Sequence, residues 1–217
     1  EMGFPVYDYR SDVRNVLVTP QIRSRFLKVE PGPMGPGHTH DLGHEVFVVL
    51  QGSAEFEIDG ERETLGPGQM CVALVDQMHS VRAVGGEPAI IYLSVTPHLQ
   101  PTHTFWDEPG RRRPHRFVAP GEYDTHVERS VPDDQVVDRY MDALGAMLEA
   151  AQATAGGAAA AQKLKTAMER GDGDAIEQAR NDLWNAAFPV YERVAAMADI
   201  WNDVAARSVE AGQRPQA

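Results

Sequence analysis

The chain has 217 residues, of which 42% are hydrophobic and 24% are charged, so it is long enough to bury a hydrophobic core. Its 20 Lys and Arg residues against 32 Asp and Glu residues give a net charge of −12, which argues against nucleic acid as a partner. The single cysteine, Cys71, excludes an intramolecular disulfide, so a reducing cytoplasm is expected. No apolar run approaches the roughly 20 residues that a membrane span needs, and the N-terminal residues do not resemble a secretory signal.

Two regions of different composition meet near residue 130. All eight histidines lie at or before His126, whereas 22 of the 27 alanines follow residue 130. The first region is rich in turn residues and the second in helix-forming residues. We therefore predict two domains, a β-rich one over residues 1–129 and an α-helical one over residues 130–217.

The first region alternates short β-branched and aromatic runs with Gly or Pro turns, as in an antiparallel sandwich or barrel. The pair Asp59-Gly60 tolerates positive φ and predicts a two-residue hairpin turn. About eight strands are expected: Ile22–Val29, His38–His40, Glu45–Leu50, Ala54–Ile58, Arg62–Leu65, Gln69–Leu74, His79–Val84 and Ala89–Val95.

The second region has the apolar period of helices. The first helix is expected to start near a capping pair of Ser130 and Asp133 and to end at Gly156-Gly157. A second helix is expected from Ala158 to Arg170, and a third from near Asp174, with a kink or a break at Phe188 because Pro189 follows it. The aromatic residues of the third helix predict a cap on the barrel or a homodimer interface; they are Trp184, Phe188, Tyr191 and Trp201.

A metal centre is the main chemical signal of the first region. His38 and His40 are alternate residues of an expected strand, so both imidazoles can point to the same side, and Glu45 follows a short turn. A third imidazole is available from His79, although spacing alone does not select it over His98 or His103. Imidazoles with a carboxylate suit a divalent first-row metal and leave coordination positions open.

The stretch from Gly32 to Gly52 resembles the first motif of the cupin superfamily, in which a Gly, a His-x-His pair, a Glu and a second Gly stand at set spacings. Gly68 and His79 fit the looser second motif, whereas Leu74 and Asp76 replace its usual Pro and Gly. The resemblance covers roughly residues 20–97. It implies a mainly β fold, a double-stranded β-helix barrel followed by an α-helical region. It also implies four metal ligands: His38, His40, Glu45 and His79.

Several other residues are candidates for a role at the same site. Arg23, Arg25, Tyr92 and Ser94 flank expected barrel strands and could orient an anionic substrate, but strand parity does not decide whether they face the cavity. His44 has the opposite parity to Glu45 and is interpreted as a surface residue or a support for the metal ligands. The segment with His98, His103 and Trp106 is interpreted as a solvated loop. Cys71 is interpreted as a small core residue.

Three functions are compatible with these features. The first is a metal-dependent oxygenase or other oxidoreductase acting on a small molecule, with Fe(II) favoured and Mn, Ni or Zn as alternatives. The second is a metal-dependent isomerase or lyase. The third is a non-catalytic module that binds a metal or a small ligand. The sequence does not name the substrate.

Overall fold

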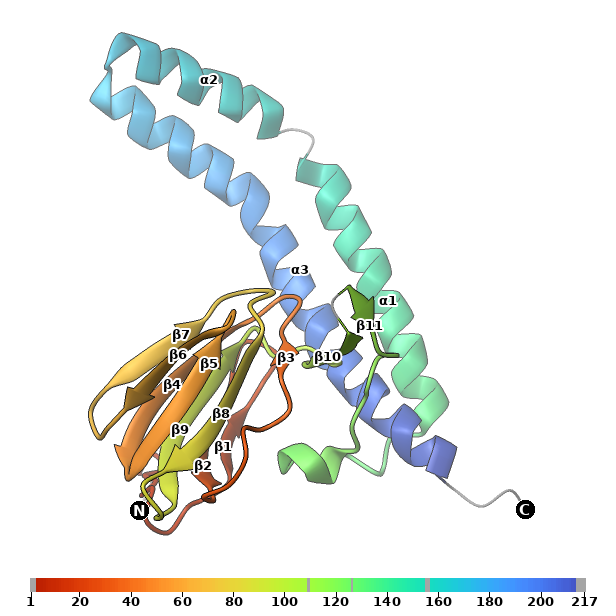
Figure 1. The fold of residues 1–217 in the computed structure, drawn as a ribbon. Helices are drawn as coiled ribbons and strands as arrows, with labels where there is room; N and C mark the ends of the chain where they lie inside the picture. Colours follow the sequence, from red (N-terminus) through yellow and green to blue (C-terminus); the bar gives the residue numbers. More distant parts are fainter. Residues whose placement is uncertain (1–2, 109, 126, 155–156, 214–217) are drawn as a thin grey trace. The chain divides into compact units, whose positions relative to one another are not determined.

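The computed structural model of the chain describes residues 3–108, 110–125, 127–154 and 157–213. The chain divides into two compact units. The first unit contains the residues up to Glu128 together with those from Ala205 onward, and the second contains Arg129–Val204. Figure 1 shows that the first unit holds the strands and that the second is built from helices.

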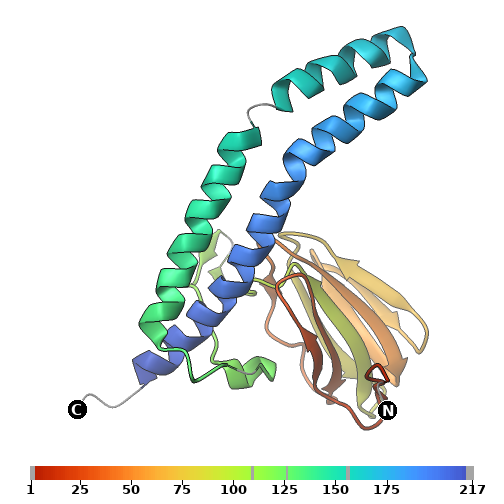
Figure 2. The same ribbon diagram turned by 180° about the vertical axis from the view of Figure 1, so that it is seen from behind.

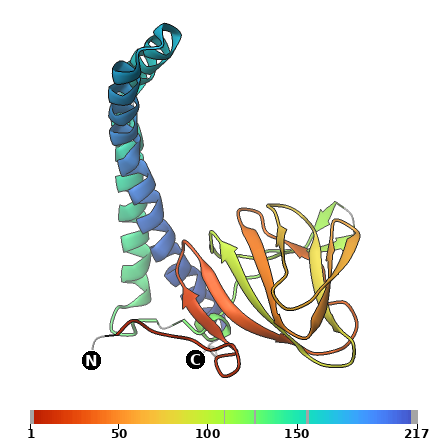
Figure 3. The same ribbon diagram turned by 90° about the vertical axis from the view of Figure 1, so that its left-hand side faces the viewer.

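The strands of the first unit form two antiparallel sheets that face each other (Figure 3). The five-stranded sheet has the order β1-β2-β9-β4-β7 and the six-stranded sheet has the order β11-β10-β3-β8-β5-β6. The predicted fold class, a β-barrel followed by an α-helical region, is confirmed. The strands are: β1 (Asn15–Val18), β2 (Arg23–Val29), β3 (His38–Thr39), β4 (His44–Gln51), β5 (Ser53–Ile58), β6 (Glu61–Leu65), β7 (Met70–Ala73), β8 (His79–Val84), β9 (Ala89–Thr96), β10 (Thr104–Glu108) and β11 (Arg111–Arg112).

Alternation along the strands builds the core between the two sheets. On β4, Phe47 and Val49 are buried, whereas the intervening Val46 and Val48 are only half-buried. Phe47 also packs its ring against Phe56 of β5, with 5.1 Å between the ring centroids. The eight expected strands correspond to β2–β9, and no end is displaced by more than one residue. The agreement is close because alternation is a local property of the sequence.

The segment after β9 differs from the expected solvated loop. It forms β10, which pairs with β3 in a register that places Phe105 opposite His38, and β10 in turn pairs with β11. A short 3-10 helix, η1 (Pro120–Tyr123), follows. β10 pairs with a strand that lies more than 60 residues earlier in the chain. The local sequence pattern therefore could not predict this pairing.

Two glycine-containing turns fix the hairpins of the barrel. Asp59 and Gly60 have φ values of 50° and 85°, as the predicted turn requires. Gly52, which joins β4 to β5, has a φ of 73°, and a Cβ placed on it would lie 2.5 Å from the carbonyl oxygen of Pro88. Gly52 is therefore required both for its backbone conformation and for space.

We expect Gly52→Ala to lower the free energy of unfolding by about 2–4 kcal/mol, because it adds backbone strain to a clash with rigid backbone. Gly32 is the matched control, since it opens the same motif but has no atom within 4 Å of a built Cβ and no positive φ. Denaturant unfolding of both variants measures the difference. Equal stability of the two alanine variants would contradict this account of Gly52.

Three helices follow the barrel: α1 (Asp133–Ala153), α2 (Gly157–Arg170) and α3 (Gly173–Gln213). Figure 2 shows α3 running beside both α1 and α2. The expected capping role of Ser130 is not observed, because Pro132 occupies the N-cap position. Gly156, where the first helix was expected to end, lies outside the described residues. Gly171, with a φ of 66°, ends α2 as expected.

The helix α3 continues through Pro189 without the expected break. A proline removes only one backbone donor, and the flanking turns keep theirs. The Trp201 ring on α3 packs against Tyr140 on α1, with 5.5 Å between centroids, and so joins the two helices. No helix of the described residues is long and apolar enough to cross a membrane.

Candidate metal centre and its cavity

Four side chains converge at one end of the barrel, and we call them the His/Glu cluster: His38, His40, Glu45 and His79. His38 on β3 lies directly opposite His79 on β8, and His40 follows β3 with the same parity as His38. Glu45 comes from β4 of the other sheet. One ligand atom from each residue lies within 4.8 Å of all the others, so the group could hold a metal ion.

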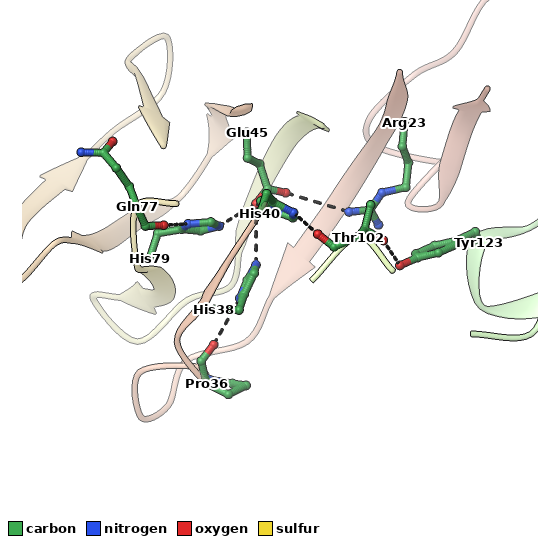
Figure 4. Close-up of polar contacts among 9 residues, drawn as sticks. All are labelled: Arg23, Pro36, His38, His40, Glu45, Gln77, His79, Thr102 and Tyr123. Atoms are coloured by element: carbon green, nitrogen blue, oxygen red, sulfur yellow. Dashed lines mark hydrogen bonds and ion pairs between the residues drawn. The ribbon is translucent and has the colours of Figure 1, made fainter. Parts of the chain in front are cut away.

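One carboxylate oxygen, Oε2 of Glu45, is at the centre of this cluster (Figure 4). The Nε2 atoms of His79 and His40 lie 2.9 and 3.0 Å from it, and the Nε2 atom of His38 lies 3.8 Å away. His40, Glu45 and His79 are buried, whereas His38 retains 19% of its side-chain exposure. His38 is thus the ligand that lies nearest to solvent.

The hydrogen bonds of the outer ring nitrogens fix the tautomers. Nδ1 of His40 donates to the carbonyl oxygen of Thr102, and Nδ1 of His79 donates to that of Gln77 at 2.8 Å. In the neutral tautomer both Nε2 atoms carry a lone pair that points at Oε2 of Glu45, which also only accepts. Without a cation, a proton on Nε2 would be needed for either imidazole to donate to this carboxylate. The buried Nε2 of His38 has no hydrogen-bond partner among the described residues. A cation satisfies all these acceptors together, so the residues present fit a divalent metal.

The electrostatics of the cluster keep Glu45 ionised. Burial alone would raise the pKa of this carboxyl, but the interactions with His38, His40 and His79 outweigh it and hold the pKa well below its usual range. Burial lowers the pKa of His38, despite the opposing effect of Glu45. The histidine and carboxylate forms favoured by these shifts are those that bind metals.

A second layer of polar contacts lies behind the cluster. Nη2 of Arg23 is 4.0 Å from Oε1 of Glu45, and both side chains are almost fully buried. The Arg23 guanidinium also lies over the ring of Tyr123, at 4.9 Å from its centroid. The Tyr123 hydroxyl is 2.6 Å from the hydroxyl of Thr102, whose carbonyl holds His40. Arg23 and Thr102 thereby orient two members of the cluster.

A cavity of about 330 Å³ opens beside the cluster. His38, Glu45 and His79 form part of its wall, and Arg23 and Arg25 of β2 form another part. The rest of the wall is mainly apolar: Leu27, Phe47, Val81, Leu93, Phe105 and Val118. The cavity therefore has the size and lining of a site for a small molecule next to a metal.

His103 also lines the cavity, although the sequence did not distinguish it. Its ring centroid lies 4.7 Å from that of His38 and 4.9 Å from that of His40, and the ring stacks on Phe105. Burial lowers the pKa of His103 to about 2, so the ring is neutral. The pairing of β10 with β3 brings His103 here, and only that pairing could have revealed it.

Two predicted candidates do not reach the cavity. Tyr92 points to the other face of its sheet, where its hydroxyl lies 3.0 Å from Ser24 Oγ and its ring packs against Phe26. Leu93, one residue on, faces the cavity in its place. His44 is exposed, and its Nδ1 accepts a hydrogen bond from the backbone of Val75 at 3.1 Å.

His98, which is buried, and Cys71, which is half-buried, do not line the cavity. His98 packs its ring edge-on against Tyr123, and burial lowers its pKa to about 3. Burial raises the pKa of the half-buried Cys71 thiol to about 11, so this thiol is not an activated nucleophile.

Comparison with known proteins gives a match over the barrel. A sequence family described as Cupin domain matches residues 25–96, and a search of curated proteins found no match. Among solved structures, a Klebsiella pneumoniae protein with a double-stranded β-helix domain is 25% identical, covering 44% of this chain and 91% of its own, with a TM-score of 0.41. KdgF from Halomonas sp. is 30% identical over 39% of this chain and 78% of its own, with a TM-score of 0.36. A salicylate 1,2-dioxygenase mutant from Pseudoaminobacter salicylatoxidans is 22% identical, covering 36% of this chain and 21% of its own, with a TM-score of 0.33.

Proposed function

Because the chain belongs to the cupin superfamily, we propose that it is a metal-dependent enzyme acting on a small molecule at the His/Glu cluster. The observation that carries the proposal is the convergence of three imidazole nitrogens and a carboxylate oxygen on one point in the wall of a cavity. These four residues would hold a divalent metal, and an ion that prefers six ligands would still have room for a substrate, unlike a closed structural site.

The reaction that we favour is an oxygenase or related oxidoreductase reaction with Fe(II). When bound, Fe(II) supplies reactivity toward dioxygen, whereas Zn, Mn or Ni supplies Lewis acidity that suits an isomerase or a lyase. The ligand set does not separate these metals, so the isomerase or lyase remains the second candidate. A non-catalytic module that binds a metal or a small ligand is the third.

The residues of the chain itself have three tasks in this proposal. The carbonyls of Thr102 and Gln77 hold the imidazoles of His40 and His79 in the ligating tautomer. Arg23 supports the position and the charge of Glu45. The apolar part of the cavity wall excludes water around the substrate, which strengthens the electrostatic contacts inside.

Oxygen uptake by Fe(II)-loaded protein, with a panel of small chelating acids, tests the favoured reaction. Uptake that depends on one acid and is lost in His79→Ala would support the oxidoreductase. Stoichiometric binding of Zn, Mn or Ni without any uptake by the iron form would instead favour the isomerase or lyase. Ligand binding without turnover of any acid in the panel would favour the binding module.

We also propose a homodimer in which the exposed aromatic face of α3 packs on a second copy. Trp184 is 54% exposed and its ring lies 5.6 Å from Phe188 and 5.7 Å from Tyr191. Four apolar residues of α1 are exposed as well, and exposed apolar surface of this kind commonly marks an interaction site. The α1 residues are Val137, Met141, Leu144 and Leu148.

We expect Trp184→Ala to halve the molecular mass in solution, because it removes the centre of the exposed aromatic stack. Trp201→Ala is the control, since Trp201 packs on Tyr140 within one chain and its loss should lower the melting temperature. Light scattering with size-exclusion chromatography measures the mass. A monomeric wild type, or an unchanged dimer in Trp184→Ala, would contradict this interface.

We also propose a cytoplasmic location, a small-molecule substrate and no nucleic-acid partner, as the sequence suggests. The single cysteine offers no internal disulfide, which suits a reducing cytoplasm. The net charge of −12 disfavours nucleic acid, and a small molecule remains the proposed substrate.

A further inference from the structure

The cavity beside the His/Glu cluster contains a half-buried arginine, Arg25, that forms no ion pair with a carboxylate of the described residues. Arg23 and Arg25 are alternate residues of β2, and both line the cavity. Arg23 faces Glu45 at 4.0 Å, whereas Glu45 and Asp124 act on the Arg25 guanidinium only through longer-range charge interactions. The Nε of Arg25 is buried without a hydrogen-bond partner among the described residues. A guanidinium stays charged under such conditions, and its unpartnered donor can bind an anion that enters the cavity.

The other charges of the cavity do not supply that anion. Arg116 pairs with Glu122 at 3.0 Å, so these two wall residues neutralise each other. The remaining carboxylate, Glu45, is shared with three imidazoles and would be taken up by a divalent cation. With the metal bound, Arg23 and Arg25 leave the cavity positive.

The rest of the cavity restricts the kind of anion. A volume of about 330 Å³ admits one small molecule. The wall also contains Leu93 and Phe105, which favour an apolar body over a highly hydroxylated one.

We propose that the substrate of this site is a small organic oxyanion with an apolar body, whose charged group is bound by Arg25 with support from Arg23. This inference rests on the proposed function, because it names the substrate class of the same cavity. A carboxylate and a phosphate monoester share the oxygen geometry that a guanidinium binds through two parallel hydrogen bonds.

Calorimetric titration of the full chain, both metal-free and loaded with Zn(II), tests this subsite with three probes of similar shape. Benzoate and phenyl phosphate carry the oxyanion, whereas benzamide is the neutral analogue of benzoate. We expect benzoate to bind at least tenfold more tightly than benzamide. Tighter binding of benzoate than of phenyl phosphate identifies a carboxylate substrate, the reverse identifies a phosphate, and either order upholds the oxyanion subsite.

Substitutions of Arg25 test whether this residue causes the preference for benzoate over benzamide. We expect Arg25→Gln to weaken benzoate binding about 10- to 100-fold and to leave benzamide binding unchanged, because only the charge-assisted bonds are lost. Arg25→Lys should recover part of the affinity, since it keeps the charge but not the paired donors. Arg62→Gln is the control, because Arg62 is exposed and pairs with Glu57 outside the cavity.

Equal affinity of the wild type for benzoate and benzamide would overturn the inference without any variant. So would an Arg25→Gln protein of native circular dichroism that keeps the wild-type preference. Metal affinity measured on the same samples separates the two proposals. Metal binding without oxyanion preference defeats only this inference, and oxyanion preference without metal binding defeats only the proposed metal-dependent function.

Discussion

His40→Ala is expected to weaken binding of a divalent transition metal by at least about 100-fold. The change removes an Nε2 atom that lies 3.0 Å from Oε2 of Glu45, together with the fixed tautomer that the Thr102 carbonyl imposes. Loss of a residue that merely supports a ligand already costs 10- to 100-fold in affinity, and loss of a ligand should cost more. Competition against a chromophoric chelator measures the affinity.

His44→Ala is the matched control for this prediction. His44 is an imidazole next to Glu45 in the sequence, but it is exposed and bonded to the backbone of Val75. Its loss should leave the metal affinity within about twofold of the wild type. Equal losses in His40→Ala and His44→Ala would show that the metal binds elsewhere.

Glu45→Gln is expected to lower the free energy of unfolding of the metal-free protein by about 3 kcal/mol. Glutamine keeps the shape of the side chain but removes the negative charge that faces Arg23, and Arg23 is only 3% exposed. A buried guanidinium left without its carboxylate is costly. Denaturant unfolding in the presence of a chelator measures the effect, free of any contribution from a metal.

Two further variants make this second prediction specific. Glu57→Gln removes a carboxylate of the Arg62 pair at the surface and should change stability by less than about 1 kcal/mol. Adding Arg23→Met to Glu45→Gln should recover much of the lost stability, because the unpaired charge disappears. A Glu45→Gln protein as stable as the wild type would contradict a structural pairing of Glu45 with Arg23.

Much of the barrel could be predicted from the sequence because its signals are local. Alternation of apolar residues marks β2–β9, and the pair Asp59-Gly60 marks a hairpin by its φ requirements. The spacing of His38, His40 and Glu45 predicts a shared direction from strand parity alone. The choice of His79 needed the cupin resemblance, since its position opposite His38 is set by the pairing of β3 with β8.

The remaining features depend on contacts between distant parts of the chain. His103 reaches the cavity because β10 pairs with β3, and no pattern within residues 98–108 reveals that partner. Tyr92 and Leu93 are adjacent, and which of them faces the cavity depends on the register of β9 between β2 and β4. A register shift of one residue would move each side chain of β9 to the other face of the sheet. The sequence alone therefore does not predict which of the two residues faces the cavity.

Elemental analysis of the wild-type chain, purified without added metal and without metal-affinity resin, tests the central claim most directly. We predict close to one equivalent of a divalent first-row metal per chain, lost in His38→Ala at unchanged fold. A folded wild-type protein that carries no metal and takes up none of Fe(II), Mn(II), Ni(II) or Zn(II) on titration would contradict a metal centre at the His/Glu cluster.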